Sequence, residues 1–286
     1  MLFISYRREF WSNELYSNHD EIRDVPLQGI GMETPVTEAQ LAKRIRGKSV
    51  LLLVHGFNNE REQIIAAYDT IFGNLQAHGI VAGAAPCYHE VIGLTWPGGR
   101  LDISYAAAKL RASAIADSVF ARLRMMVGEA KSVDINTHSL GARVALKALQ
   151  NAAVGVPPGS SPNAIRIRNL WLTAAAVDND SIERGEKFFA PTQSCETVYV
   201  LHSSKDKVLR IWFPIGEMSS GSLPDKALGL NGPDNPKNIK NHSKNVKVVD
   251  CSRPKLDHGD YKNSPDVFAF YASELRTGSA PQFSKL

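Results

Sequence analysis

Short apolar runs alternate with segments of helical periodicity along most of the chain. Residues 49–54, SVLLLV, are continuously apolar, which is typical of a strand buried on both faces of a sheet. Similar runs predict further strands at 2–6, 91–96, 165–175, 197–201 and 246–249, with a short strand starting at 132. The polar region 11–40 leaves room for one more short strand.

Helical periodicity follows several of these strands. Apolar side chains recur on one broad face at Ile64, Tyr68, Ile71 and Leu75. One long alanine-rich helix is predicted for 103–127, and Ser264-Pro265 starts a terminal helix as an N-cap followed by a first-turn proline. Strands alternating with helices predict an α/β fold, in which helices cover both faces of a mostly parallel central sheet.

The chain contains no internal repeat and no clear domain boundary, so residues 1–286 are expected to form a single domain. Residues 211–245 have no clear period and contain many glycines and prolines. A structureless segment of that length in a compact domain is usually functional or mobile. It is therefore predicted to be a cap or an active-site loop.

Composition and charge exclude several classes of function. The net charge of +4 is mild, and the only compact basic cluster, 43–48, is too short to indicate nucleic-acid binding. The three cysteines are far apart, and neither CxxC nor HExxH occurs, so we expect no disulfide framework, no metal and no cofactor. No apolar run reaches the ~18 residues of a membrane span, and the start does not resemble a secretory signal. A cytoplasmic protein is expected; the oligomeric state stays open.

The stretch 132–149, SVDINTHSLGARVALKAL, contains the candidate nucleophile. A β-favouring start passes through Thr137-His138-Ser139-Leu140-Gly141 into a segment with helical spacing. A serine in such a sharp turn adopts a strained backbone conformation and presents its hydroxyl. His138 is expected to pack beside this turn. We predict that Ser139 is an acyl-transfer nucleophile.

A serine nucleophile needs a base and an acid that orients the base. The carboxyl ends of parallel strands lie at one edge of a sheet, so the partners should also follow strands. Asp206 follows the strand 197–201, and His258 follows the strand 246–249. Asp178, after the strand 165–175, is an alternative acid. His202 and His242 are alternative bases in less suitable positions.

The transition state also needs donors for a developing oxyanion. One is the backbone N–H of Leu140, directly after the nucleophile. The second is expected from Phe57, because Gly56 lets the loop after 49–54 approach closely. His55 is expected to orient this loop. Asn58, Trp96, Trp212 and Phe213 are candidate substrate contacts, although Asn58 and Asn59 equally suit a turn and the aromatic residues equally suit a core.

These motifs together resemble the alpha/beta-hydrolase superfamily. The resemblance spans about 50–271 and is carried by 55–59 (HGFNN), 94–97 (LTWP), 137–141 (THSLG), Asp206 and His258. It is closest to a bacterial branch with a His-Gly-Phe-Asn-Asn oxyanion loop, usually catalogued as hydrolases of unknown function. It implies a three-layer fold, a Ser139-Asp206-His258 triad and hydrolysis of an ester or related acyl bond.

The resemblance defines no substrate beyond a small acyl compound. Thr137 departs from the family pattern G-x-S-x-G, which often has glycine at this position, although a β-branched residue can still clear the helix behind the turn. An alternative is a binding or interaction protein that keeps the fold without turnover. A lyase or transferase using the same serine is also open.

Overall fold

The computed structural model describes residues 1–14, 20–27, 31–57, 59–99, 105–154, 165–219 and 226–286. Its strands are β1 (Leu2–Ser5), β2 (Glu21–Asp24), β3 (Thr34–Pro35), β4 (Ser49–Val54), β5 (Glu90–Thr95), β6 (Ser132–His138), β7 (Ile167–Thr173), β8 (Cys195–His202), β9 (Val246–Asp250) and β10 (Phe283–Lys285). Its helices are α1 (Glu38–Ile45), α2 (Arg61–Ala77), α3 (Tyr105–Ala114), α4 (Ala116–Glu129), α5 (Gly141–Val154), α6 (Phe189–Gln193), α7 (Lys207–Ser219), α8 (Leu228–Asn231), α9 (Pro236–His242), α10 (Pro265–Thr277) and the 3₁₀ helix η1 (Asp260–Asn263).

These strands form one sheet in the order β10-β9-β8-β7-β6-β4-β5-β1-β2-β3. Neighbouring strands from β10 to β1 run parallel, whereas β1–β2 and β2–β3 are antiparallel. All six residues of β4, which lies between β5 and β6, are buried. Helices cover both faces of the sheet, so the predicted mostly parallel α/β architecture is confirmed.

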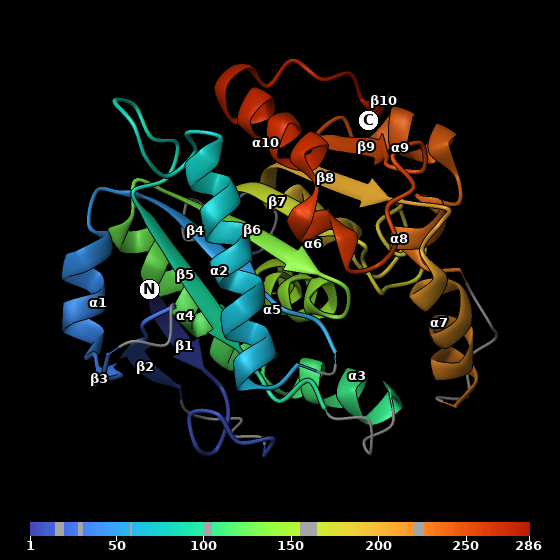
Figure 1. Ribbon diagram of the computed structural model, residues 1–286. Helices are drawn as coiled ribbons and strands as arrows, with labels where there is room; N and C mark the ends of the chain where they lie inside the picture. The colour runs from blue at the N-terminus through green and yellow to red at the C-terminus, as the bar shows by residue number, and fades with distance from the viewer. Residues whose placement is uncertain (15–19, 28–30, 58, 100–104, 155–164, 220–225) are drawn as a thin grey trace.

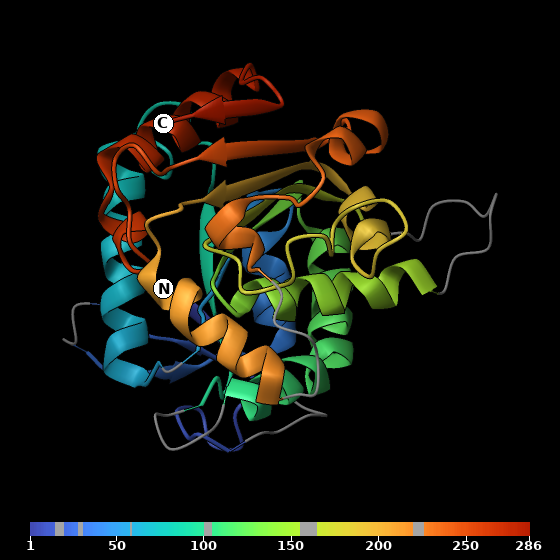
Figure 2. The ribbon, with the colours of Figure 1, turned by 90° about the vertical axis from the view of Figure 1, so that its right-hand side faces the viewer.

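Figures 1 and 2 show the three layers. Helices α2 and α10 lie on one face of the sheet, and α1, α4 and α5 lie on the other. Helix α7 lies in front of the sheet in Figure 2, with α3 near its C-terminal end. Among the described helices, none is both long enough and apolar enough to cross a bilayer.

The structure corrects two expectations about individual helices and strands. The single helix predicted for 103–127 is two helices, α3 and α4, divided at Ile115, whose φ of −88° and ψ of −2° depart from regular helix. Residues 100–104 lie outside the described part. Because Ile115 is buried like its apolar neighbours, the hydrophobic pattern runs through the break unchanged. The strand 246–249 is also followed by another, β10.

Residues 211–245 contain regular structure, contrary to expectation. The end of α7, all of α8 and all of α9 lie there. Several supposed breakers mark helix ends: Gly232 is the C-cap of α8, and Pro236 begins α9 after the N-cap Asn235. Pro214 lies inside α7, where its surroundings tolerate it. Residues 220–225 are outside the described part.

An ion pair between a fully buried carboxylate and a partly exposed arginine joins two central strands. Asp134 of β6 is fully buried and accepts hydrogen bonds from Arg168 Nε at 2.8 Å, Tyr88 Oη at 2.6 Å and Asn169 Nδ2 at 2.8 Å. Just before β7, Arg166 makes a comparable contact with Glu196 at 3.1 Å, but both side chains are exposed. The two arginines therefore offer a matched comparison of an ion pair to a buried carboxylate and an exposed ion pair.

We predict that Arg168→Met lowers the free energy of unfolding by about 3 kcal/mol, because it leaves a buried carboxylate without its charge partner. Arg166→Met should lower it by less than about 1 kcal/mol, because water screens an exposed pair. Urea denaturation of both variants measures the difference. Equal losses would contradict the assignment of Asp134 as a buried charge that depends on Arg168.

Candidate functional site

Ser139 lies in the turn between β6 and α5, with a strained backbone. Its φ is +55°, in the left-handed region that non-glycine residues rarely adopt. The Ser139 N–H donates to Thr173 O at 3.0 Å, and its carbonyl accepts from the Ala176 N–H at 3.1 Å. Both partners belong to the end of β7 and the turn after it, so the neighbouring strand holds the strained conformation in place.

The turn packs tightly against the loop after β4. A Cβ at Gly141 would lie 2.5 Å from Val54 O and 2.6 Å from His55 O, so only glycine fits. Thr137, which departs from the family pattern, is fully buried and donates from Oγ1 to Trp171 O at 2.9 Å. A hydrogen bond to β7 thus accommodates Thr137, whereas the glycine after the serine is sterically required.

Asp206 and His258 are brought together from two different loops. Asp206 follows β8, is fully buried, and its Oδ2 lies 2.7 Å from His258 Nδ1. The other carboxylate oxygen accepts from the Leu209 N–H at 2.8 Å, which fixes the orientation of the acid. Since an ionised carboxylate only accepts, the His258 Nδ1 carries the proton in this pair.

The alternative residues take other places. Asp178 follows β7, forms an isolated bridge with Ala227, and its carbonyl accepts from Ser181 Oγ at 2.6 Å. The His242 ring faces Arg184 Nη1 at 3.2 Å, on the surface. The His202 ring lies against Gly232. The acid that contacts His258 is therefore Asp206.

His138 holds the backbone of His258. Its Nε2 donates to His258 O at 2.7 Å, and the two rings lie 4.6 Å apart. Burial, assisted by the nearby charge of His258, lowers the pKa of His138 to about 3, so its ring is neutral. The sequence suggested only packing for His138. Its alternation with Asp134 and Asn136 along β6 was the available signal of a polar face.

His55 and Trp96 fix the loop after β4. The Trp96 N–H donates to His55 Nε2 at 3.2 Å, so His55 Nδ1 carries the proton and donates to Gly56 O at 2.8 Å. Trp96 Nε1 also donates to His55 O at 2.9 Å. Burial lowers the pKa of His55 to about 3 and keeps it neutral. Trp96 is 0% exposed and does not line the cavity described below, so it supports the loop instead of contacting substrate.

Two backbone N–H groups lie at this junction. A Cβ at Gly56 would lie 2.8 Å from Ser139 Cβ, so the loop approaches the serine as closely as glycine allows. The N–H groups of Phe57 and Leu140 donate to no other described residue. Because both lie beside Ser139 without another described acceptor, both are candidates for holding a developing negative charge.

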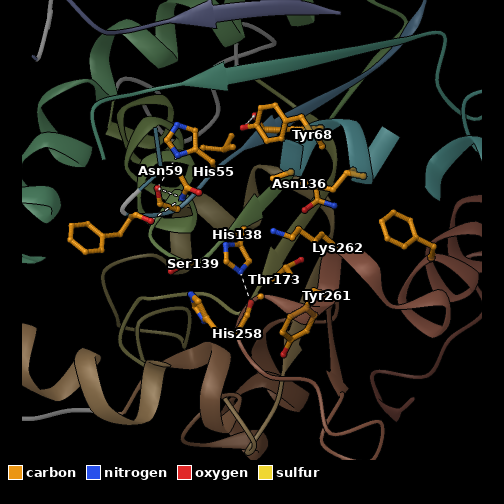
Figure 3. Close-up of a pocket in the computed structure, with 18 of the residues that line it drawn as sticks. His55, Asn59, Tyr68, Asn136, His138, Ser139, Thr173, His258, Tyr261 and Lys262 are labelled. Atoms are coloured by element: carbon orange, nitrogen blue, oxygen red, sulfur yellow. Dashed lines mark hydrogen bonds between the residues drawn. The ribbon is translucent and has the colours of Figure 1, made fainter. Parts of the chain in front are cut away.

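A cavity of about 250 Å³ opens beside Ser139 (Figure 3). Ser139, His138 and His258 line it together with Gly56 and Phe57. Ile71 and Phe268 contribute apolar walls, and Asn136 and Lys262 contribute polar groups. In the described ranges, no three His, Cys, Asp or Glu side chains are grouped to hold a metal ion.

The remaining predicted contacts lie away from this cavity. Phe213 is buried and packs edge-on against Tyr105, which packs edge-on against Phe57. Phe213 thus supports the loop after β4 indirectly. Trp212 is 60% exposed on α7, among other exposed apolar side chains of the same helix. Asn58 lies outside the described residues.

A comparison with protein-family models shows which family the chain belongs to. The family model described as "Alpha/beta hydrolase of unknown function (DUF900)" matches residues 33–274. The chain belongs to this alpha/beta-hydrolase family. The resemblance to the alpha/beta-hydrolase superfamily is thereby confirmed. Among curated protein sequences, none matches the chain.

Solved structures of similar fold have low sequence identity to this alpha/beta hydrolase. The lin2722 gene product of Listeria innocua is 11% identical, with a TM-score of 0.45, covering 84% of this chain and 98% of that one. The propionate-bound esterase Est2 from the planctomycete Thermogutta terrifontis is 11% identical, with a TM-score of 0.35 and 82% of each chain covered. Carboxyl esterase 2 from Tuber melanosporum is 10% identical, with a TM-score of 0.36, covering 93% of this chain and 70% of that one.

The two neutral buried histidines predict a pH dependence of stability. Their pKa values near 3 lie below the value of about 6.5 in an unfolded chain, so the unfolded state binds more protons between these limits. The free energy of unfolding should therefore fall as pH decreases below about 6.5. Each histidine should contribute up to about 1.4 kcal/mol per pH unit.

His138→Gln tests this directly, because glutamine keeps an N–H donor for His258 O but does not titrate. Urea unfolding between pH 4.5 and 7 gives the free energy of unfolding at each pH. Its slope against pH should be smaller in the variant than in the wild type, by the amount that corresponds to one fewer proton taken up on unfolding. Identical slopes would show that His138 does not remain neutral in the folded protein.

Proposed function

We propose that this alpha/beta hydrolase is a serine hydrolase that cleaves an ester or a related acyl bond. The observation that carries the proposal is the 2.7 Å contact between Asp206 and His258, with His258 lining the same cavity as Ser139. The strained turn at Ser139 and the N–H groups of Phe57 and Leu140, which donate to no described residue, support the same chemistry. No cofactor is needed for it.

In the proposed mechanism, the Asp206 carboxylate holds the proton of His258 on Nδ1, which leaves Nε2 as the base. Nε2 takes the Ser139 hydroxyl proton while Oγ forms a bond to the substrate carbonyl carbon. The Phe57 and Leu140 N–H groups stabilise the oxyanion. His258 then returns the proton to the leaving alcohol, and water hydrolyses the acyl-enzyme by the same steps.

His138 and His55 act as positioning residues in this mechanism. His138 holds the backbone carbonyl of His258, and His55 holds the oxyanion loop through Gly56. Since burial keeps both rings neutral, neither adds a positive charge that would discourage protonation of His258 during the reaction. The imidazolium that forms at His258 is then paired with Asp206.

Ser139→Ala should abolish labelling by a fluorophosphonate probe and hydrolysis of short p-nitrophenyl esters. Asp206→Asn should lower kcat by roughly a thousandfold, less than the serine variant, because the carboxylate orients the base but does not form bonds to the substrate. Asp178→Asn, the matched control at the alternative acid position, should leave kcat unchanged. Equal labelling of wild type and Ser139→Ala would overturn the proposal, and specific labelling without hydrolysis across an ester, thioester and amide panel would favour a binding protein.

Gly56→Ala should lower kcat by about a hundredfold, because the added methyl group meets Ser139 and pushes the Phe57 N–H away from the oxyanion. Gly73→Ala, in α2, is the matched control: a Cβ there contacts nothing within 4 Å, and kcat should not change. Esterase kinetics with circular dichroism on both variants separate catalysis from folding. Full activity of a folded Gly56→Ala protein would exclude Phe57 as an oxyanion donor.

A further inference from the structure

The central strand β6 has an unusual polar face. A strand covered by helices on both sides normally carries apolar residues on both faces, but Asp134, Asn136 and His138 alternate along one face of β6. Asp134 is bound by Arg168, and His138 is bound to His258 O. The Asn136 side chain interacts with the Tyr271 hydroxyl and also faces the cavity. It is only partly buried although its strand lies between β4 and β7, because it faces the cavity beside Ser139.

The Tyr271 hydroxyl contacts the Asn136 side chain without using all of its hydrogen-bonding capacity. Tyr271 Oη lies 3.0 Å from Thr173 Oγ1, and both residues line the cavity. The Asn136 side chain also interacts with the Tyr271 hydroxyl. A side-chain amide offers two N–H donors and one oxygen, so one such contact leaves at least one N–H free for a ligand.

Lys262 brings a positive charge to the same cavity. It belongs to η1, four residues after His258, and its side chain extends toward Asn136 and His138 in Figure 3. Lys262 forms no ion pair with any described residue. The cavity lining contains no Asp or Glu among the described residues. The ammonium group is therefore available for an anion that enters the cavity.

We propose that the Lys262 ammonium and the Asn136 amide select substrates carrying a carboxylate close to the scissile ester bond. This inference rests on the proposed function and names the substrate class of the same site. A cation and a free amide N–H both donate to a carboxylate, and neither suits a purely alkyl chain. The cavity of about 250 Å³ is small for a ligand pocket, so the ester is short.

A set of small esters tests the preference and locates the charge. Monoethyl succinate carries the carboxylate on the acyl side, and ethyl levulinate is its neutral counterpart with a methyl ketone. Acetylated 3-hydroxypropanoate carries the carboxylate on the alcohol side, and 4-acetoxy-2-butanone is its neutral counterpart. With wild-type protein in a pH-stat, kcat/KM for one charged ester should exceed that of its neutral counterpart by at least about tenfold.

Variants assign the preference to the two side chains. Lys262→Met should lower the charged-to-neutral ratio of kcat/KM by about tenfold or more, and Lys262→Arg should restore part of it. Asn136→Leu should lower the same ratio. Lys237→Met, at an exposed lysine of α9 outside the cavity, should keep the wild-type ratio. Because each ratio is measured on one preparation, a general loss of activity or folding cancels.

A binding measurement separates the two proposals. Succinate should raise the melting temperature of the wild-type protein more than its neutral diamide, succinamide, does, and Lys262→Met should remove this difference. If fluorophosphonate labelling fails but succinate still binds through Lys262, the proposed function falls and the anion site stands. If esters are hydrolysed but neutral and charged counterparts react equally well, the carboxylate preference is overturned while the hydrolase is retained.

Discussion

The strained turn at Ser139 is the constraint on which the site depends. A non-glycine residue with a left-handed backbone costs roughly 1–3 kcal/mol and persists only where its surroundings determine it. Here the end of β7 binds both the N–H and the carbonyl of Ser139, and Gly141 lies against the carbonyls of Val54 and His55. Three parallel strands, β4, β6 and β7, therefore have to end in register before the serine can take its place.

Burial of neutral polar groups does much of the positioning around this turn. His55 and His138 are held without charge, each by a hydrogen bond whose direction is fixed by a carbonyl acceptor. Asp206 is buried too, but its two oxygens are occupied by His258 and by the N–H of Leu209. These three side chains are thus each satisfied locally, which avoids the cost of an unpaired group.

The sequence was most informative where a local pattern and the overall fold impose the same requirement. The continuous apolar run of β4 predicts a buried strand, and a parallel sheet then requires that groups following β4, β6, β8 and β9 meet at one edge. That reasoning predicts that Ser139, Asp206 and His258 lie near one another at this edge. The N-cap at Ser264 is predicted from the Ser-Pro pair alone. It is confirmed, because the Ser264 side chain accepts from the Val267 N–H.

Other features depend on tertiary contacts that no local pattern encodes. The sequence makes Trp96 a candidate substrate contact. In the structure it lies in the core, where its indole N–H donates to His55 O and its backbone N–H donates to His55 Nε2. The helices within 211–245 were missed because glycine and proline were interpreted as breakers, whereas Gly232 and Pro236 delimit helices. The role of His138 required knowing where the backbone of His258 passes, 120 residues later in the chain.

The polar face of β6 connects stability, positioning and the proposed substrate recognition in one strand. Side chains two residues apart point to the same face of a strand, so Asp134, Asn136 and His138 form a row that leads toward Ser139. Asp134 binds the neighbouring strand, and His138 supports the general base of the proposed mechanism. Asn136 lies between them, where it contacts the Tyr271 hydroxyl and also faces the cavity. A polar residue kept in the middle of a central strand without a full set of protein hydrogen bonds is more readily explained by a ligand than by the fold.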